Sequence, residues 1–406
     1  MGGASSSEQT AQSETPTFFT QEELNKLKSD FEKGGVEKLK PYLERKVVEL
    51  DKTELNIAVT GQSGAGKSTF INAMRGLQST DKGAAEVGTT ETTKVPSRYP
   101  HPNLPNVCYW DLPGIGTTRF SVANYLKEMK FKRFDFFIII AACRFMENDA
   151  NLAKEIKKLG KNFYFVRSKI DCDLYAMRNE RKEINEKEEL DKIRTDCIKR
   201  LREAGIRHPT VFLISSFQPK QYDFSRLNEA LKGGLSNVKK RIFVLSLPNL
   251  SVEFVRKKSE MLKKSIWMSA TLSGGLGAVP VPGLSFACDI GIVIGQIIFF
   301  RKCLGLDDDS LLKLANRADK PVEELKAEIK SPLRGEITRD TIVKFGMRAS
   351  VVALSAVEFA FDFVPVLGSI FGAGSSFLLT YTILNDVLKD LTESAERVVN
   401  VAFGTN

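Results

Sequence analysis

Gly61–Gln62–Ser63–Gly64–Ala65–Gly66–Lys67–Ser68 is the stretch of sequence that decides the fold. It follows a short apolar run at residues 55–59 and fits the pattern G-x-x-x-x-G-K-[ST], a phosphate-binding loop between a strand and a helix. Its glycines let backbone N–H groups wrap phosphates, which a Cβ would obstruct. Lys67 would place its charge on the β and γ phosphates, and Ser68 would offer a ligand to Mg²⁺. The candidate nucleotide-binding residues here are Gly61, Gly64, Gly66, Lys67, Ser68 and Thr69.

Strand-like runs continue downstream of this loop, separated by helical stretches. They lie at residues 107–110, 136–140, 163–166 and 211–214. This alternation predicts an α/β domain with a mostly parallel sheet and helices on both faces. Residues 176–205 are expected to form one charge-rich, solvated helix.

A motif after the second strand and a loop before it extend the site. Asp111–Leu112–Pro113–Gly114 follows the second run, where Asp111 would hold Mg²⁺ through water and the Gly114 N–H would reach the γ-phosphate. A switch loop between Ser68 and this motif should supply one Mg²⁺-binding threonine. Composition leaves four candidates, Thr89, Thr90, Thr92 and Thr93.

Ser168–Lys169–Ile170–Asp171, which follows the run at 163–166, is expected to bind the base of the nucleotide. A carboxylate at Asp171 can accept from both N1–H and N2–H₂ of guanine, whereas adenine offers no such pair. Lys169 would cover the ring. The motif therefore indicates GTP and disfavours an ATPase or kinase. Ser215 and Ser216 are candidates for a backbone contact to the guanine O6, or belong to an ordinary loop.

Composition excludes several other classes of protein. The 406 residues include 42% hydrophobic and 27% charged residues, so the chain is globular, with two or three domains. Six cysteines without CxxC spacing and two histidines argue against a disulfide framework or a His/Cys zinc site. The net charge of +9 is mild for this length, and no motif indicates nucleic-acid binding.

GTP hydrolysis is expected to require a group from outside this chain. The residue after the D-x-x-G motif is Ile115, where small GTPases carry a glutamine that orients the attacking water. An aliphatic side chain cannot orient water. Activation by a partner or by self-association is therefore expected.

Together these motifs resemble those of the interferon-inducible immunity-related GTPases of the Gly-Lys-Ser subclass, closely over about residues 50–260. The similarity is carried by residues 61–68, 83–85, 101–107, 110–117, 128–131, 134–140, 144–145, 148–149 and 163–167. The chain departs from the family pattern at Ser168, where threonine is usual, and at Ser216, where asparagine is common.

The resemblance implies a P-loop GTPase domain inserted in an all-α helical domain built from the N- and C-terminal segments. The expected division is a flexible N-terminus at 1–20, helices at 21–52, the GTPase domain at 53–240 and C-terminal helices at 241–406. It also implies GTP-dependent dimers and oligomers formed through the nucleotide face, with related GTPases as further partners. Glu91, Thr93 as the Mg²⁺ threonine, and Arg144 would then join Lys67 and Gly114 in catalysis.

Membrane contact is expected at the N-terminus. Met1–Gly2–Gly3–Ala4–Ser5–Ser6 fits M-G-x-x-x-[ST], so Gly2 is a candidate for myristoylation, the alternative being a disordered start. One acyl chain binds membranes only marginally, so a second contact is needed. A basic segment at residues 239–264, of net charge +6, would supply it or form a solvated helix face. The apolar blocks at 284–300 and 349–384 contain acidic residues and are expected to be buried hairpins rather than membrane spans.

The sequence thus predicts a Mg²⁺-dependent GTPase that binds GTP and GDP, cytoplasmic and partly associated with intracellular or pathogen-vacuole membranes. The leading interpretation is a self-assembling effector of cell-autonomous immunity. The alternative is a GTP-loaded switch or scaffold in which hydrolysis is incidental.

Overall fold

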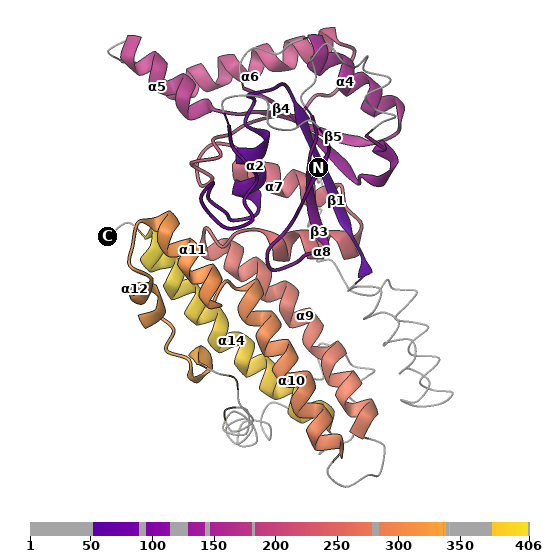
Figure 1. Cartoon of the computed structure of the whole chain (residues 1–406), viewed down its shortest axis with the longest axis vertical. Coiled ribbons are helices and arrows are strands. Elements are labelled where there is room, and N and C mark those ends of the chain that lie inside the picture. Colours follow the sequence, from indigo (N-terminus) through magenta and orange to yellow (C-terminus); the bar gives the residue numbers. More distant parts are fainter. Residues whose placement is uncertain are drawn as a thin grey trace, which may run out of the picture.

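The computed structural model describes residues 52–88, 95–113, 129–142, 147–180, 183–277, 284–335 and 376–404, together with Ile337 and Thr341. Two regions are visible in Figure 1. The sheet region covers the described residues from 52 to 236, and the helical region covers those from 237 to 404.

The sheet has six strands in the order β2-β3-β1-β4-β5-β6. The five strands expected from apolar runs are confirmed as β1 (Leu55–Gly61), β3 (Val107–Asp111), β4 (Phe136–Ala141), β5 (Asn162–Arg167) and β6 (Val211–Leu213), all paired in parallel. The sequence reading missed β2 (Ser97–Pro100), which pairs antiparallel with β3 at the edge of the sheet. Its polar residues and proline suit an edge position and give no strand signal.

Each face of the sheet is covered by helices, as expected. Ile57 and Val59 of β1 point into a core shared with α2 (Lys67–Met74), α7 (Phe224–Gly233) and α8 (Asn237–Ser246). Ala58, between them in sequence, points to the opposite core. That core is shared with α4 (Glu147–Lys158), α5 (Ile170–Glu180) and α6 (Glu186–Glu203), and the short helix η1 (Phe131–Arg133) joins it. The period of two along a strand produces this separation.

The expectation of a single helix over 176–205 is wrong. Helix α5 ends at Glu180, and α6 begins at Glu186 behind the N-cap Asn185. The Asn185 side chain accepts a hydrogen bond from the Glu188 N–H at 3.4 Å. Acidic residues in the first turn of α6 favour a helix start at this point, because they complement the partial positive charge of the helix N-terminus.

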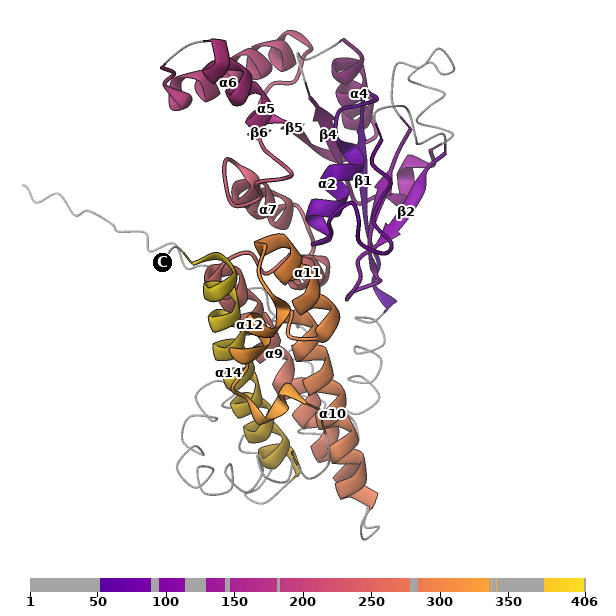
Figure 2. The same ribbon diagram turned by 60° about the vertical axis from the view of Figure 1, so that its left-hand side comes forward.

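The helical region is built on three long helices, α9 (Val252–Gly277), α10 (Leu284–Cys303) and α14 (Ser376–Phe403), which contact one another. Two shorter helices, α11 (Asp308–Ala318) and α12 (Val322–Ala327), pack against α14, as Figure 2 shows, and η2 (Pro332–Arg334) follows them. The expected helical C-terminal region is confirmed, and the last described strand is β6, which ends at Leu213. Within the described ranges, no helix is both long and apolar enough to cross a bilayer.

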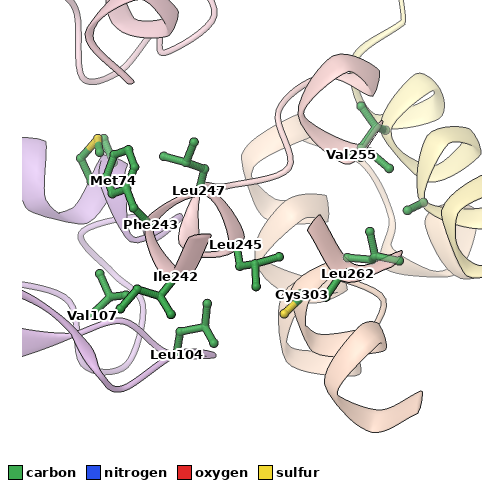
Figure 3. Packing of buried hydrophobic residues seen from close by; sticks show 14 of the residues in the cluster. Met74, Leu104, Val107, Ile242, Phe243, Leu245, Leu247, Val255, Leu262 and Cys303 are labelled. Atoms are coloured by element: carbon green, nitrogen blue, oxygen red, sulfur yellow. The ribbon is translucent and has the colours of Figure 1, made fainter. Parts of the chain in front are cut away.

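Helix α8 connects the two regions and contains the boundary expected at residue 240. In Figure 3, Phe243 and Ile242 lie on the side of Met74 and Val107, whereas Leu245 lies toward Cys303 and Leu262. Residues from the sheet, α8 and the long helices belong to one continuous hydrophobic cluster. The two regions are therefore packed against each other through α8.

Candidate nucleotide-binding site

The loop between β1 and α2 turns sharply through glycines with positive φ. Gly61 has φ of +140°, and a Cβ there would lie 2.0 Å from the backbone oxygen of Ile140 in β4. Gly66 is the N-cap of α2 with φ of +87°, and its oxygen accepts from the Phe70 N–H at 2.9 Å. Side chains at these positions would strain the backbone, and at Gly61 would also collide with the neighbouring strand.

Lys67 is the first residue of α2 and is almost fully buried. Its Nζ donates to the backbone oxygens of Gln62 at 3.1 Å and Gly61 at 3.4 Å. The ammonium group is therefore held inside the turn of the loop, at the N-terminal end of a helix. Both features favour binding of phosphate oxygens.

The candidate Mg²⁺ ligands meet beside this loop. Ser68 Oγ donates to Asp111 Oδ2 at 2.6 Å. Asp111 is buried at the end of β3, paired in register with Val59 of β1. A hydroxyl and a carboxylate side by side are hard oxygen donors of the kind that Mg²⁺ prefers, so these residues fit the metal.

The expected base-binding motif lies directly next to the phosphate loop. Ser168 is buried, and its Oγ donates to the Ala65 oxygen at 2.7 Å. Lys169 is exposed with φ of +58°, and its Cε lies 3.9 Å from the position that a Cβ on Gly66 would take. Asp171 stands in the first turn of α5 and is partly exposed. Both side chains are accessible to a nucleotide held by the loop.

The segment with Ser215 and Ser216 borders the same motif, because the Ile170 N–H donates to the Ile214 oxygen at 3.2 Å. Ser215 is fully buried, and its Oγ accepts from the Gln218 N–H at 3.2 Å. The Ser215 hydroxyl therefore stabilises its own turn, which leaves backbone groups as the means of contacting a base. Ser216 is partly exposed.

Arg167 is a structural residue beneath the base motif to which the sequence analysis assigned no role. It is buried at the end of β5 and donates to the oxygens of Ser168, at 2.7 Å, and Ala142, and to the Asp173 carboxylate. Burial raises the pKa of Asp173, against the opposing effect of Arg167. A charged residue that ends an apolar strand run, directly before Ser168, was the available signal. Arg167 ties β4, β5 and α5 together beneath the base motif.

Of the other candidate residues, only Thr69 lies in the described part of the chain. It is partly exposed in the first turn of α2. The remaining ones, on which the structure makes no statement, are Gly2, Thr89, Thr90, Glu91, Thr92, Thr93, Gly114 and Arg144.

Several basic side chains of the segment 239–264 form ion pairs or are buried. Lys239 pairs with Asp135, and Arg256 pairs with Glu396 at 2.8 Å. Lys257 pairs with Glu229 at 3.1 Å and Glu253 at 2.7 Å. Burial also lowers the pKa of Arg241 to about 9 and that of Lys258 to about 8. Part of the segment is thus used inside the fold, and its contact with a membrane stays a prediction.

Comparison with known proteins gives strong matches. The family model "Interferon-inducible GTPase (IIGP)" matches residues 20–396. The chain is 40% identical over 386 residues to Interferon-inducible GTPase 5 of Rattus norvegicus, covering 95% of this chain and 83% of the relative. It is 39% identical over 385 residues to Interferon-gamma-inducible GTPase 10 of Mus musculus, covering 93% and 89%. Among solved structures, the FeoB G-domain from Methanococcus jannaschii matches 45% of this chain and 97% of that chain, with 19% identity and a TM-score of 0.28.

Proposed function

The chain belongs to the interferon-inducible GTPase family, and from this premise we propose how and where it acts. As a member of that family, it is a GTP-hydrolysing enzyme of interferon-induced immunity. We propose that it assembles with itself in a GTP-dependent way through its nucleotide-binding edge, and that this dimerisation activates hydrolysis. Its proposed place of action is the membrane of pathogen-containing vacuoles or of microbes.

The hydrogen bond between Ser68 and Asp111 is the observation that carries the catalytic part of the proposal. These two oxygen donors would hold Mg²⁺, which when bound neutralises charge that develops on the phosphates. Lys67, already turned into the loop, would move its hydrogen bonds from backbone oxygens to the β and γ phosphates. Asp171 would accept from the guanine N1–H and N2–H₂, and Lys169 would cover the ring.

Activation within a dimer would supply the water-orienting group that this chain lacks after its D-x-x-G motif. Ile115 cannot orient a water molecule, so a second subunit has to complete the site. We assign Glu91 and Arg144 to this contact, with Thr93 as a Mg²⁺ ligand and the Gly114 N–H on the γ-phosphate. Surface apolar groups support a contact here, because Tyr175 on α5 and Phe217 after β6 are 67% and 76% exposed.

Membrane association is proposed to depend on acylation of Gly2, because the sequence start fits the myristoylation pattern. A single chain gives weak, reversible binding, so assembly would strengthen it by bringing several chains together. The proposed location is therefore cytoplasmic, with a membrane-bound fraction that grows with GTP-dependent assembly. Related GTPases are further candidate partners through the same nucleotide face.

The test is GTP turnover per molecule over a range of protein concentrations, for the wild-type chain and for Glu91→Ala. We expect specific activity to rise with concentration in the wild type and to stay flat in the variant. Glu203→Ala, an exposed glutamate on α6, is the matched control and should behave as wild type.

A rate independent of protein concentration would exclude activation in the dimer. It would favour the alternative function, a GTP-loaded scaffold that recruits partners while hydrolysis is incidental. A concentration-dependent rate that Glu91→Ala leaves intact would keep self-assembly but remove Glu91 from the contact.

A further inference from the structure

A cavity of about 80 Å³ lies between the sheet region and the helical region. Its walls come from the end of α2, the segment before β3, the segment between α8 and α9, and helices α9, α10, α11 and α14. Among the described residues that line it, none is acidic. Its cationic residues are Arg75, Lys258, Lys302, Lys313 and Arg317.

Lys258 is buried in this cavity without a carboxylate partner among the described residues. It is only 3% exposed, and its Nζ donates to the backbone oxygen of Cys303 at 2.8 Å. Burial lowers its pKa to about 8, so the side chain is still mostly protonated at neutral pH. A buried charge that meets only a neutral dipole is costly to the fold, and a bound anion would offset that cost.

The two arginines of the cavity are held in the same way. Arg75 donates to the backbone oxygens of Pro100 at 3.1 Å and Gly83 at 2.9 Å, and Arg317 donates to that of Leu77 at 3.4 Å. Burial lowers the pKa of both guanidinium groups. Carbonyl groups therefore fix these cations in place but do not neutralise them.

Lys302 and Lys313 complete the cationic lining. Lys302 is exposed at the end of α10, and Lys313 is partly buried on α11. Within the described part of the chain, neither side chain forms an ion pair. They are free to turn toward a ligand that enters the cavity.

The positive charge around the cavity also affects the pKa of His101. Burial lowers its pKa to about 3, with further lowering by Lys258, Arg75 and Lys313. The imidazole is therefore neutral at physiological pH, and three cations act on the same small space. Two carboxylates lie nearby without lining the cavity: Asp81, which accepts from the Gln78 N–H and acts to raise the pKa of Arg317, and Asp307, which accepts from the Ser310 N–H.

We propose that this interdomain cavity binds a phosphomonoester group, as a second anion site separate from the nucleotide site. A small dianion matches both the volume of the cavity and its cationic lining, which holds no acidic residue among those described. Helix α2 separates the two sites, with Lys67 at its start and Arg75 at its C-cap, about 12 Å apart by helix rise. The group belongs either to a soluble phosphorylated metabolite or to the headgroup of a lipid.

The experiment uses the full chain saturated with GDP, so that the phosphate loop cannot compete. Isothermal titration measures binding of glycerol phosphate, and co-sedimentation measures binding to phosphatidylcholine vesicles with and without phosphatidic acid, which carries the same phosphomonoester. The test variant is Lys302→Gln/Lys313→Gln. The control is Lys330→Gln, an exposed lysine outside the cavity.

We expect a binding event beyond the nucleotide, weakened at least about tenfold in the double variant and unchanged in the control. Unchanged GDP affinity and melting temperature would show that the variant is folded. Binding of glycerol phosphate alone identifies a soluble ligand, and binding of phosphatidic acid vesicles alone identifies a lipid. Absence of binding to both probes, or equal binding by the double variant, overturns the proposal.

Discussion

Ser168 Oγ donates a hydrogen bond of 2.7 Å to the backbone oxygen of Ala65, joining the base-binding motif to the phosphate-binding loop across 103 positions of the chain. The same hydroxyl lies 3.3 Å from the Ala141 oxygen, and the Ser168 N–H donates to that oxygen at 2.9 Å. The two halves of the nucleotide site are therefore held at a fixed separation. Serine in place of the usual threonine keeps the hydroxyl that makes this link.

Ser168→Ala should weaken binding of GDP by about 5- to 30-fold, because it removes a buried hydrogen bond worth about 1–2 kcal/mol and leaves the Ala65 oxygen unsatisfied. Ser168→Thr retains the hydroxyl and should stay within about threefold of wild type. Titration with a fluorescent GDP analogue measures both affinities. Equal affinities for the alanine and threonine variants would show that the hydroxyl does not position the site.

Asp111→Asn should reduce Mg²⁺-dependent GTP hydrolysis by at least about a hundredfold, because the metal loses a charged oxygen partner next to Ser68. Hydrolysis is measured at increasing Mg²⁺ concentrations. Asp196→Asn is the control for loss of a carboxylate away from the site, since the exposed Asp196 on α6 pairs with Arg200. Wild-type Mg²⁺ dependence in Asp111→Asn would exclude Asp111 from the metal site.

Asp171→Asn should change the base preference from guanine to xanthine. The amide N–H₂ can donate to the additional carbonyl of xanthine, whereas it can no longer accept from both guanine donors. We expect GTP affinity to fall by at least about a hundredfold and XTP affinity to exceed it, as competition against a fluorescent nucleotide would measure. A variant that still prefers GTP would place base recognition elsewhere.

Gly61→Ala should destabilise the fold by more than about 2 kcal/mol, because the new Cβ would meet the Ile140 oxygen at 2.0 Å and the backbone has φ of +140°. Gly83→Ala is the matched control, with φ of +79° and open space around the Cβ, and should cost about 1 kcal/mol. Urea denaturation of both variants compares the two effects. Similar losses would mean that contact with β4 does not determine this position.

The sequence predicts most of what is local in this molecule. Five strands and the phosphate loop are encoded in contiguous apolar runs and glycines. β2 is not, because its strand pairing depends on β3 and its residues carry no apolar signal. Long-range partners are also invisible in sequence, as with Arg256, which pairs with Glu396 at a separation of 140 positions. The cationic cavity escaped prediction for the same reason, since its lysines and arginines come from separate segments.

The protein should lose stability as the pH falls below neutrality, because His101 is buried in its neutral form. Its pKa is lowered from 6.5 to about 3 in the folded state, chiefly by burial and then by Lys258 and Arg75. Between these two pKa values His101 binds a proton in the unfolded chain but not in the folded one. Protonation therefore favours unfolding as the pH decreases. From about pH 7.5 to about pH 5 the free energy of unfolding should fall by about 2 kcal/mol from this group alone.

Urea denaturation at several values of pH measures this loss, and His101→Gln should flatten its dependence whatever its effect on stability at neutral pH. His208→Gln is the matched control, because His208 is exposed and its replacement should preserve the wild-type slope. Lys258, with a pKa of about 8, stays largely protonated in both states over most of this range and contributes little to the slope. Equal slopes for wild type and His101→Gln would mean that His101 accepts a proton in the folded protein, and that the cavity is less positive than its lining indicates.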